Sequence, residues 1–472
     1  MFDPVIAPSG TLLGLLQRGR GDGTLHALTA PRAEALAALN HCVLRDPRHD
    51  WQVENRSLYY ARLYLDLNGE LDDIEAHLFD AEDAFDTEES RTGLALAVLG
   101  HLASYGRRDA LWLLRRYATS GANWSWALDE LALRDDDAGL RALAVPVLAR
   151  FATDAEGEAE LAATVRDAFE PRPWRLWAED PREYVSARVR AAQETGCFDR
   201  WQRQMSPSGP RPGWSVAAVF EWAQQGVERG AALHVPAARC LAAVAGPEDR
   251  PEILRAAQDG TEGARCTALR YLADSHDPAV LDLVEQAVAT GTTPVVEAAV
   301  DAFERMRSVA AVDRARGWVH RPDPLGAAAG RVLACRGATR DSDLVLGALR
   351  EAVRGDGCDA TTLWPLIDGA RRLGIVCAAP VLRHIYRETA SSHLRGHCAQ
   401  ALAATDPSFA TGFAVECLWD CEETTREVAA RHAETGDARV VERLRRLAAD
   451  PAEEAEVQTA VRSRIGPDTA AM

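Results

Sequence analysis

Two tryptophans and a carboxylate at helical spacing form the most suggestive chemical group in the sequence. Trp124, Trp126 and Asp129 lie in SGANWSWALDELALR, just after a basic stretch that contains Arg115 and Arg116. Tryptophan rings stack on flat bases and attract cations, and a nearby carboxylate complements a positive charge. The set therefore predicts a site for a cationic ring, or else tryptophans that pack between helices.

A second polar group lies in HCVLRDPRHDWQVENRSLYYARLYLD, residues 41–66. Glu54 has tyrosines and arginines one to two helical turns away, which is the minimum that acid–base chemistry needs. The same residues also read as a capped, charged helix start, and no nucleophile is marked among them. We expect the structural role.

Two patterns raise the question of a metal. His393 and His397 stand one helical turn apart, as do Cys417 and Cys421 on the next predicted helix, and two His with two Cys suit tetrahedral zinc. Cys417 falls at a core position of the repeat described below, so we expect no metal there. Residues 70–89 hold ten acids and no Arg or Lys but lack the spacing of a calcium loop, which favours a solvated loop.

Arginines recur along the predicted helices of the second half of the chain. They are suited to bidentate binding of carboxylates or phosphates, so they could line a surface for an acidic protein segment. They could equally pair with Asp and Glu of neighbouring helices, and the sequence leaves both readings open. The arginines concerned are Arg265, Arg270, Arg331, Arg371, Arg372, Arg395, Arg426 and Arg431.

Composition removes several classes of function. All 53 basic residues are arginine, so a lysine Schiff base, a lysine general base and a P-loop lysine are excluded. The net charge of −18 argues against general binding of nucleic acid, although a local basic groove stays possible. The glycine-rich stretches RGRGDG and GDGCD lack the strand–helix context of a cofactor fingerprint, and we expect no cofactor.

The apolar content predicts helices rather than sheets. The chain is 47% hydrophobic but only 6% aromatic, so Ala, Leu and Val dominate. No apolar run is long enough to cross a bilayer, no signal peptide is evident, and the ten cysteines form no CxxC pair. These features favour an all-α protein in the cytoplasm.

A repeat of about 30 residues organises the second half of the chain. Helices with small residues on one face end in a bulky or apolar closing position, and successive closing positions are 28, 31, 30, 40, 29 and 31 residues apart. That period holds one antiparallel helix pair per repeat, and Asp-Pro dipeptides at 277, 323, 406 and 450 are suited to starting helices. The closing positions are Val244, Leu272, Phe303, Leu333, Leu373, Leu402 and Ala433.

The segment HLRGHCAQALAATDPSFATGFAVECL resembles the short bacterial HEAT-like repeat, in which a helix of V-R-x-A-A-x-A-L type precedes a D-P turn. SVAAVDR and GATRDSDLVLGAL occupy the following-helix position in other copies. The resemblance covers residues 215–465 well and 91–160 moderately, and it departs from the pattern at the 40-residue step, where GDGCDATTLW adds a longer turn. It implies a right-handed α-solenoid whose second helices line a concave face.

Four segments follow from this pattern. We expect an atypical acidic helical cap over residues 1–90, HEAT-like repeats over 91–170, an irregular Pro- and Trp-rich junction over 171–214, and a second repeat array over 215–472. In the junction, Trp201, Trp214 and Trp222 are suited to covering helix faces where regular stacking lapses, or to docking a partner.

The favoured function is a scaffold or adaptor, not an enzyme, that binds a protein partner on the concave face. The alternative comes from a resemblance of Trp124, Trp126 and Asp129 to residues that HEAT-like DNA glycosylases use to hold a damaged nucleotide. A mixed or acidic groove would favour the scaffold, and a continuous positive groove beside the tryptophans would favour the alternative.

Overall fold

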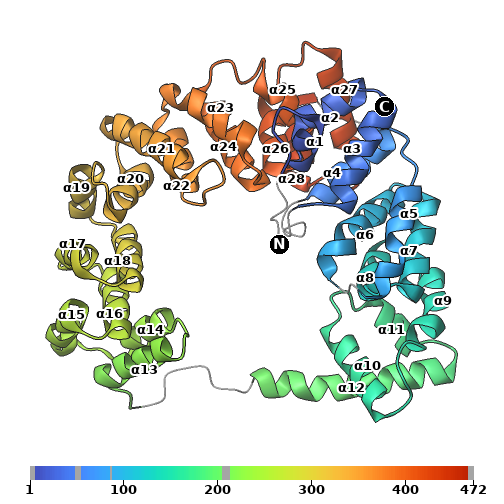
Figure 1. Cartoon of the computed structure of the whole chain (residues 1–472), viewed down its shortest axis with the longest axis horizontal. Coiled ribbons are helices and arrows are strands. Elements are labelled where there is room, and N and C mark those ends of the chain that lie inside the picture. Colours follow the sequence, from blue (N-terminus) through green and yellow to red (C-terminus); the bar gives the residue numbers. More distant parts are fainter. Residues whose placement is uncertain (1–5, 48–54, 86–87, 205–212, 466–472) are drawn as a thin grey trace. The chain divides into compact units, whose positions relative to one another are not determined.

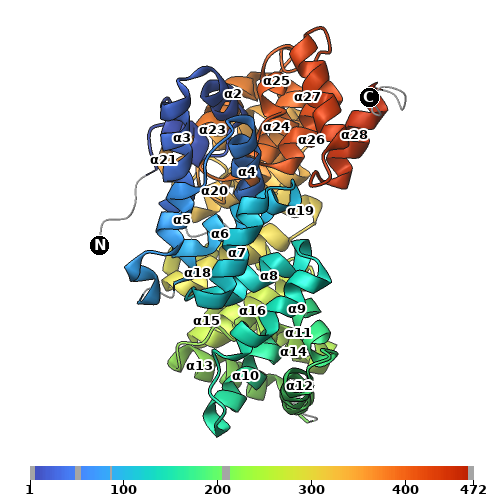
Figure 2. The same cartoon turned by 90° about the vertical axis from the view of Figure 1, so that its right-hand side faces the viewer.

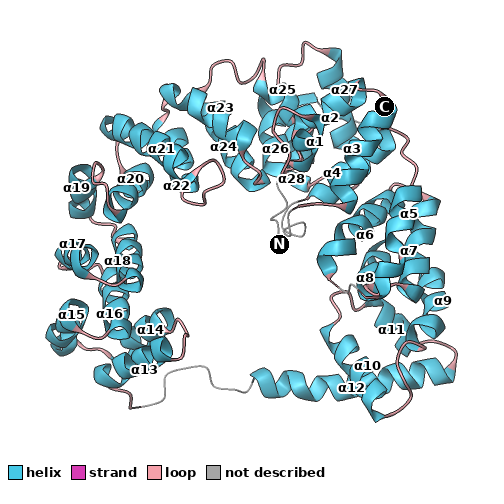
Figure 3. Ribbon diagram, viewed as in Figure 1, coloured by secondary structure: helices cyan, strands magenta, loops and turns pink. Residues whose placement is uncertain are grey.

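The computed structural model describes residues 6–47, 55–85, 88–204 and 213–465. These residues form α-helices, a few 3-10 turns and no strand (Figure 3). The all-α expectation is therefore confirmed. Most helices pack against a neighbour in the sequence, as in a helical repeat solenoid.

The chain divides into two compact units. The first unit contains residues 1–206, 387–399 and 407–472, and the second contains residues 207–386 and 400–406. The first unit holds α1 (Leu12–Gln17), α2 (Gly21–Thr29), α3 (Arg32–Leu44), α4 (Arg56–Asp66), α5 (Asp72–Leu78), α6 (Glu89–Ser104), α7 (Arg108–Ser120), α8 (Trp124–Arg134), α9 (Asp137–Leu148), α10 (Ala155–Asp167), α11 (Arg172–Ala178), α12 (Glu183–Gln204), α25 (Phe413–Cys417), α26 (Glu423–His432), α27 (Ala438–Ala449) and α28 (Ala455–Ile465).

The second unit holds α13 (Val216–Glu228), α14 (His234–Val244), α15 (Arg250–Asp259), α16 (Glu262–Asp274), α17 (Val280–Thr290), α18 (Thr293–Arg305), α19 (Val309–Trp318), α20 (Pro324–Arg336), α21 (Ser342–Asp356), α22 (Leu363–Leu373) and most of α23 (Ala379–Glu388). The last helix, α24 (Ser392–Thr405), contributes residues to both units.

The second unit has the regular order that the repeat predicts. Each outer helix, α15, α17, α19 or α21, packs on the helix that follows it, and these second helices, α16, α18, α20 and α22, pack one on the next. The closing residues Leu272, Phe303 and Leu333 are buried, as expected. The second helices therefore form a continuous row, and side chains on their outward positions share one face.

Close approach between α20 and α22 depends on a glycine. A Cβ at Gly369 of α22 would lie 2.5 Å from the Cβ and 2.7 Å from the Cα of Ala334 of α20, which is closer than carbon atoms can pack. The small-residue face that the sequence predicts thus sets the spacing of the row.

The Asp-Pro dipeptides have more varied roles than predicted. Asp323 caps α20 by accepting a hydrogen bond from the Leu325 amide, with Pro324 at the first helical position, as expected. The prediction of a helix start was wrong at Asp406 and Asp450, where turns follow. Their carboxylates bind arginines instead: Asp406 pairs with Arg383 and Asp450 with Arg62.

Residues from both ends of the described sequence meet inside the first unit. Figure 1 and Figure 2 show α2 beside α25, and these helices are in contact. The Cys421 amide donates to the Gly19 carbonyl at 2.8 Å, and a Cβ at Gly21 would lie 1.8 Å from the Glu416 carbonyl oxygen. The first and last helices therefore share one core rather than capping opposite ends of an array.

Helices also replace most of the irregular junction expected over residues 171–214. Residues 172–178 form α11 and residues 183–204 form α12. The prolines were misleading because Pro171 and Pro173 stand at the start of α11, where the missing N–H costs nothing.

Candidate functional site

The structure places Trp124, Trp126 and Asp129 on α8, where their contacts are internal. Trp124 packs edge-on against Phe151, with ring centroids 5.8 Å apart, and Trp126 packs against the hydrophobic core. The Asp129 carboxylate accepts a hydrogen bond from the Glu170 amide at 3.1 Å. These contacts match the packing role that the sequence left open.

The surroundings of Asp129 are acidic rather than basic. Burial raises the pKa of Asp129 to about 6, and the negative charge of Glu170 adds to the rise. Burial raises the pKa of the adjacent Glu130 to about 7, against the lowering effect of Arg134. The two predicted arginines are engaged elsewhere. Arg115 pairs with Asp135 at 2.5 Å. Arg116 pairs with Glu75 and lies over the ring of Phe79.

Arg395 and Arg426 are buried in the first unit, so of the two readings that the sequence left open, pairing with neighbouring acids holds for them and facing a partner does not. Their side chains are 0% and 1% exposed. The Arg395 Nε donates to Asp420 at 3.1 Å, and the Arg426 Nη2 donates to Glu453 at 2.6 Å. The sequence could not distinguish them from less buried arginines, since Arg265 has the equivalent position, seven residues before its closing residue, and is only half-buried.

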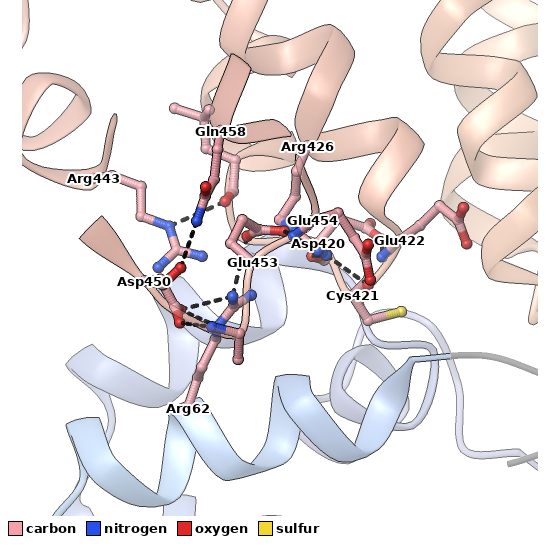
Figure 4. A network of polar contacts seen from close by, with 12 residues as sticks. Arg62, Asp420, Cys421, Glu422, Arg426, Arg443, Asp450, Glu453, Glu454 and Gln458 are labelled. Carbon is pink, nitrogen blue, oxygen red and sulfur yellow. Dashed lines mark hydrogen bonds and ion pairs between the residues drawn. The ribbon is translucent and has the colours of Figure 1, made fainter. Parts of the chain in front are cut away.

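Arg426 belongs to a polar network that joins segments far apart in the sequence (Figure 4), and Arg395 contacts this network through Asp420. Arg62 of α4 reaches Asp450 at 2.7 Å and Glu453 at 3.1 Å, both in the turn before α28. Arg426 also donates to the Cys421 carbonyl at 2.6 Å. Such a buried, interconnected set is costly to break and is positioned to specify how the two segments fit.

The remaining predicted arginines differ in their partners. Two form ion pairs between neighbouring helices, Arg371 and Arg431 face acids of their own helices, and Arg372 donates to the Ala334 and Gly337 carbonyls. In the second unit Arg331 of α20 pairs with Glu304 of α18, and Arg270 of α16 pairs with Asp301 of α18 at 2.9 Å. Arg371 is about half exposed and lies 4.0 Å from Asp368 of its own helix. The Arg265 Nε has no hydrogen-bond partner among the described residues.

The other predicted groups are only partly described. Among the described residues, no group of three potential metal ligands occurs. His393 lies 3.3 Å from Glu422, while Cys417 and Cys421 are buried. Glu54 lies outside the described residues.

The tryptophans of the expected junction are only partly described. Trp214 and Trp222 pack edge-on against each other, with ring centroids 5.3 Å apart, and both are half-buried. Trp201 lies on α12, and its side chain is outside the described set.

A groove of about 740 Å³ crosses three second helices of the second unit. The lining comes from α18, from α20 and from the turn and first residues of α22. The residues that line it are Gly291, Thr293, Val296, Glu297, Val300, Asp301, Glu304, Pro324, Arg331, Thr361, Thr362 and Pro365. Its volume is in the range, roughly 300 to 1,000 Å³, in which proteins bind ligands or partner side chains.

One wall of this groove is acidic. Glu297, Asp301 and Glu304 follow one another at intervals of four and three residues, so they share one face of α18. The single arginine of the lining, Arg331, already pairs with Glu304. Glu297 is exposed and forms no ion pair among the described residues.

Another part of the lining comes from the place where the repeat departs from its period. Thr361 and Thr362 belong to the longer turn that makes one step 40 residues instead of about 30. The aliphatic carbons of Val296 and Val300 and the rings of Pro324 and Pro365 complete the lining. The groove thus offers carboxylates beside an apolar surface.

A second cavity, of about 460 Å³, lies within the first unit beside the contact of α2 with α25. Leu25, Glu416, Glu434 and Asp437 are among its lining residues. Burial raises the pKa of Glu416 to about 7, and Asp22 contributes to the rise while Arg20 opposes it. Neither Glu416 Oε1 nor Asp22 Oδ1 has a hydrogen-bond partner among the described residues.

No family model, curated protein or solved structure matches the chain. Within the described part, the helices include none that is both long and apolar enough to span a membrane. The groove of the second unit is the candidate functional site, because it is the largest of the cavities described above and crosses the row of second helices.

Of the residues predicted from the sequence, the groove contains Arg331 alone. The acidic wall was missed, although the spacing of Glu297, Asp301 and Glu304 in PVVEAAVDAFERM is visible in the sequence. The longer turn was noticed only as a break in the repeat. Both signals become informative once the helices are known to be adjacent.

Proposed function

We propose that this chain is a HEAT-like repeat protein, a right-handed solenoid in its repeat array, which acts as a scaffold by binding a segment of another protein. The binding face is the row of second helices in the second unit, which we take as the concave face. The observation that carries the proposal is the groove over α18, α20 and α22. Repeat proteins bind partners on such continuous faces.

The character of the groove supports a protein ligand. It combines apolar side chains with a few charged groups, the composition by which a protein groove holds a peptide. The lining has three carboxylates and one arginine, a mixed to acidic surface. Phosphate recognition requires the opposite charge, and no observation favours the nucleic-acid alternative.

Photocrosslinking in the native cell tests the proposal. A photoreactive amino acid at Thr362, inside the groove, is compared with the same amino acid at Val309, which is 77% exposed on outer helix α19. We expect discrete crosslinked protein from Thr362 and none of the same species from Val309. Equal crosslinking at both positions, or none at Thr362, would contradict the proposal.

A further inference from the structure

We propose that the segment bound in the groove is basic: an extended stretch of a partner protein in which one or more Arg or Lys side chains stand among apolar residues. This inference rests on the proposed function and specifies the partner's chemistry. It follows from charge complementarity between the partner and the acidic wall of α18.

The first step of the argument concerns which groove charges are available to a ligand. Arg331 and Glu304 neutralise each other, and Asp301 is shared by Arg270 and Arg305, each at 2.9 Å. Glu297 is the exposed acid of the lining that forms no ion pair among the described residues. The charge open to a ligand is therefore negative.

The second step concerns the shape of the ligand side chain. Val296 lies one residue before Glu297 and Val300 three residues after it, and all three line the groove, so apolar surface flanks the carboxylate on α18. Arg and Lys have aliphatic stems that cover apolar surface while their charged ends reach an acid. An acidic segment would place like charges together, and a purely apolar one would leave Glu297 covered without a partner.

The third step concerns approach from a distance. The chain carries 71 acidic and 53 basic residues. An excess of negative charge accelerates encounter with a basic partner, and the acceleration weakens as salt is added. The net charge of the molecule and the free charge of the groove thus both favour a positively charged partner.

Panning a random peptide library on the full chain tests the inference directly, because the library samples every charge class and no partner has to be chosen in advance. Peptides of about twelve residues are long enough, when extended, to cross three adjacent helices. We expect the enriched sequences to carry net positive charge with Arg or Lys beside Val, Ala or Pro. Enrichment of neutral or acidic sequences, or no enrichment, would overturn the inference.

Two variants with the same charge change then locate the binding. Glu297→Arg reverses the free charge of the groove, whereas Glu228→Arg reverses an exposed charge at the last residue of α13, outside the groove and where a cation suits the helix end. In fluorescence anisotropy with an enriched peptide, we expect Glu297→Arg to weaken binding by roughly tenfold and Glu228→Arg by less than about twofold. Equal weakening would show a response to net charge alone and would overturn the assignment to the groove.

The two proposals fail in different ways. If Thr362 crosslinks a partner while panning enriches acidic or neutral peptides, the basic occupant is wrong and the scaffold function stands. If neither experiment detects a ligand at the groove, both are wrong.

Discussion

Single residues in the first unit give its stability two opposite dependences on pH. The pKa of Glu416 is raised to about 7, first by burial and then by Asp22. Burial acts in the same direction on Glu453, but Arg426 and Arg62 outweigh it and lower the pKa of Glu453. Glu453 therefore contributes stability that is lost in acid, and Glu416 contributes stability that is lost as the pH rises towards neutrality.

Glu416 makes the first unit less stable as the pH rises. The folded state keeps a proton that the unfolded state releases, so stability is highest below the unfolded pKa of 4.5, falls through the interval up to about 7 and is level above it. We expect a loss of about 1–3 kcal/mol across this interval, measured by denaturant unfolding at a series of pH values.

The matched variant is Glu416→Gln, which keeps the shape of the side chain and removes its titration. Its decline between about pH 5 and pH 7 should be smaller than that of the unmodified chain, with the remainder due to Asp129 and Glu130, whose pKa values are also raised. At about pH 8 its stability should exceed that of the unmodified chain. The fall on strong acidification should persist in the variant, because it arises from Glu453 and other paired carboxylates. An unchanged decline in Glu416→Gln would assign the effect to another group.

Packing between elements sets the spacing of the second helices and with it the groove. Gly369 lies against Ala334 with no space for a side chain, so Gly369→Val should separate α20 from α22 and destabilise the second unit by about 1–3 kcal/mol. The same variant should weaken peptide binding, since Arg331 of α20 and Pro365 of α22 both line the groove. Thermal unfolding and anisotropy measure the two effects.

A second glycine provides the control. Gly347 lies within outer helix α21, and a Cβ there would meet nothing within 4 Å. Gly347→Ala should leave peptide binding unchanged and stabilise the unit by about 0.5–1 kcal/mol, because alanine favours the helix. If Gly369→Val left stability and peptide binding as unaffected as Gly347→Ala does, the close approach of α20 and α22 would not be the reason for a glycine at residue 369.

Local patterns in the sequence predicted the elements better than the contacts between them. The small-residue faces and closing positions predicted the second helices, and Asp323 marked the start of α20, because these signals act within a few residues of where they are read. Arg395 and Arg265 have equivalent positions in the repeat, seven residues before Leu402 and Leu272, yet Arg395 is fully buried and Arg265 is only half-buried. This difference in burial depends on contacts with segments that are remote in sequence, and the sequence of a single repeat does not reveal those contacts.

The whole molecule departs most from the sequence prediction at its ends. An array would have a polar cap at each end, and the acidic start of the chain suggested one. Instead, Arg62 near the start pairs with Asp450 near the end, and the Cys421 amide binds the Gly19 carbonyl. No local pattern could reveal this, because the partners are separated by most of the sequence.

This arrangement predicts that shortening one end weakens the other. Deleting the residues up to Thr29 removes α1 and α2 and uncovers α25, so amides of residues 413–421 should lose protection in hydrogen exchange by roughly tenfold or more. Amides of α16 and α18 in the second unit serve as the internal control and should keep theirs. Retained protection of residues 413–421 would show that α25–α28 are stable without the start of the chain.

The contacts between the first and last helices of the first unit also determine when this unit can finish folding during synthesis. A ribosome makes α1–α4 long before α25–α28, yet the groups that neutralise Arg62, namely Asp450 and Glu453, emerge only after α27. Until then the surface that α25–α28 will cover stays exposed on the early helices. Chaperones bind exposed surface of this kind. A chain that terminates before α25 never covers that surface, so a truncated product is distinguishable from a finished one by its first helices alone.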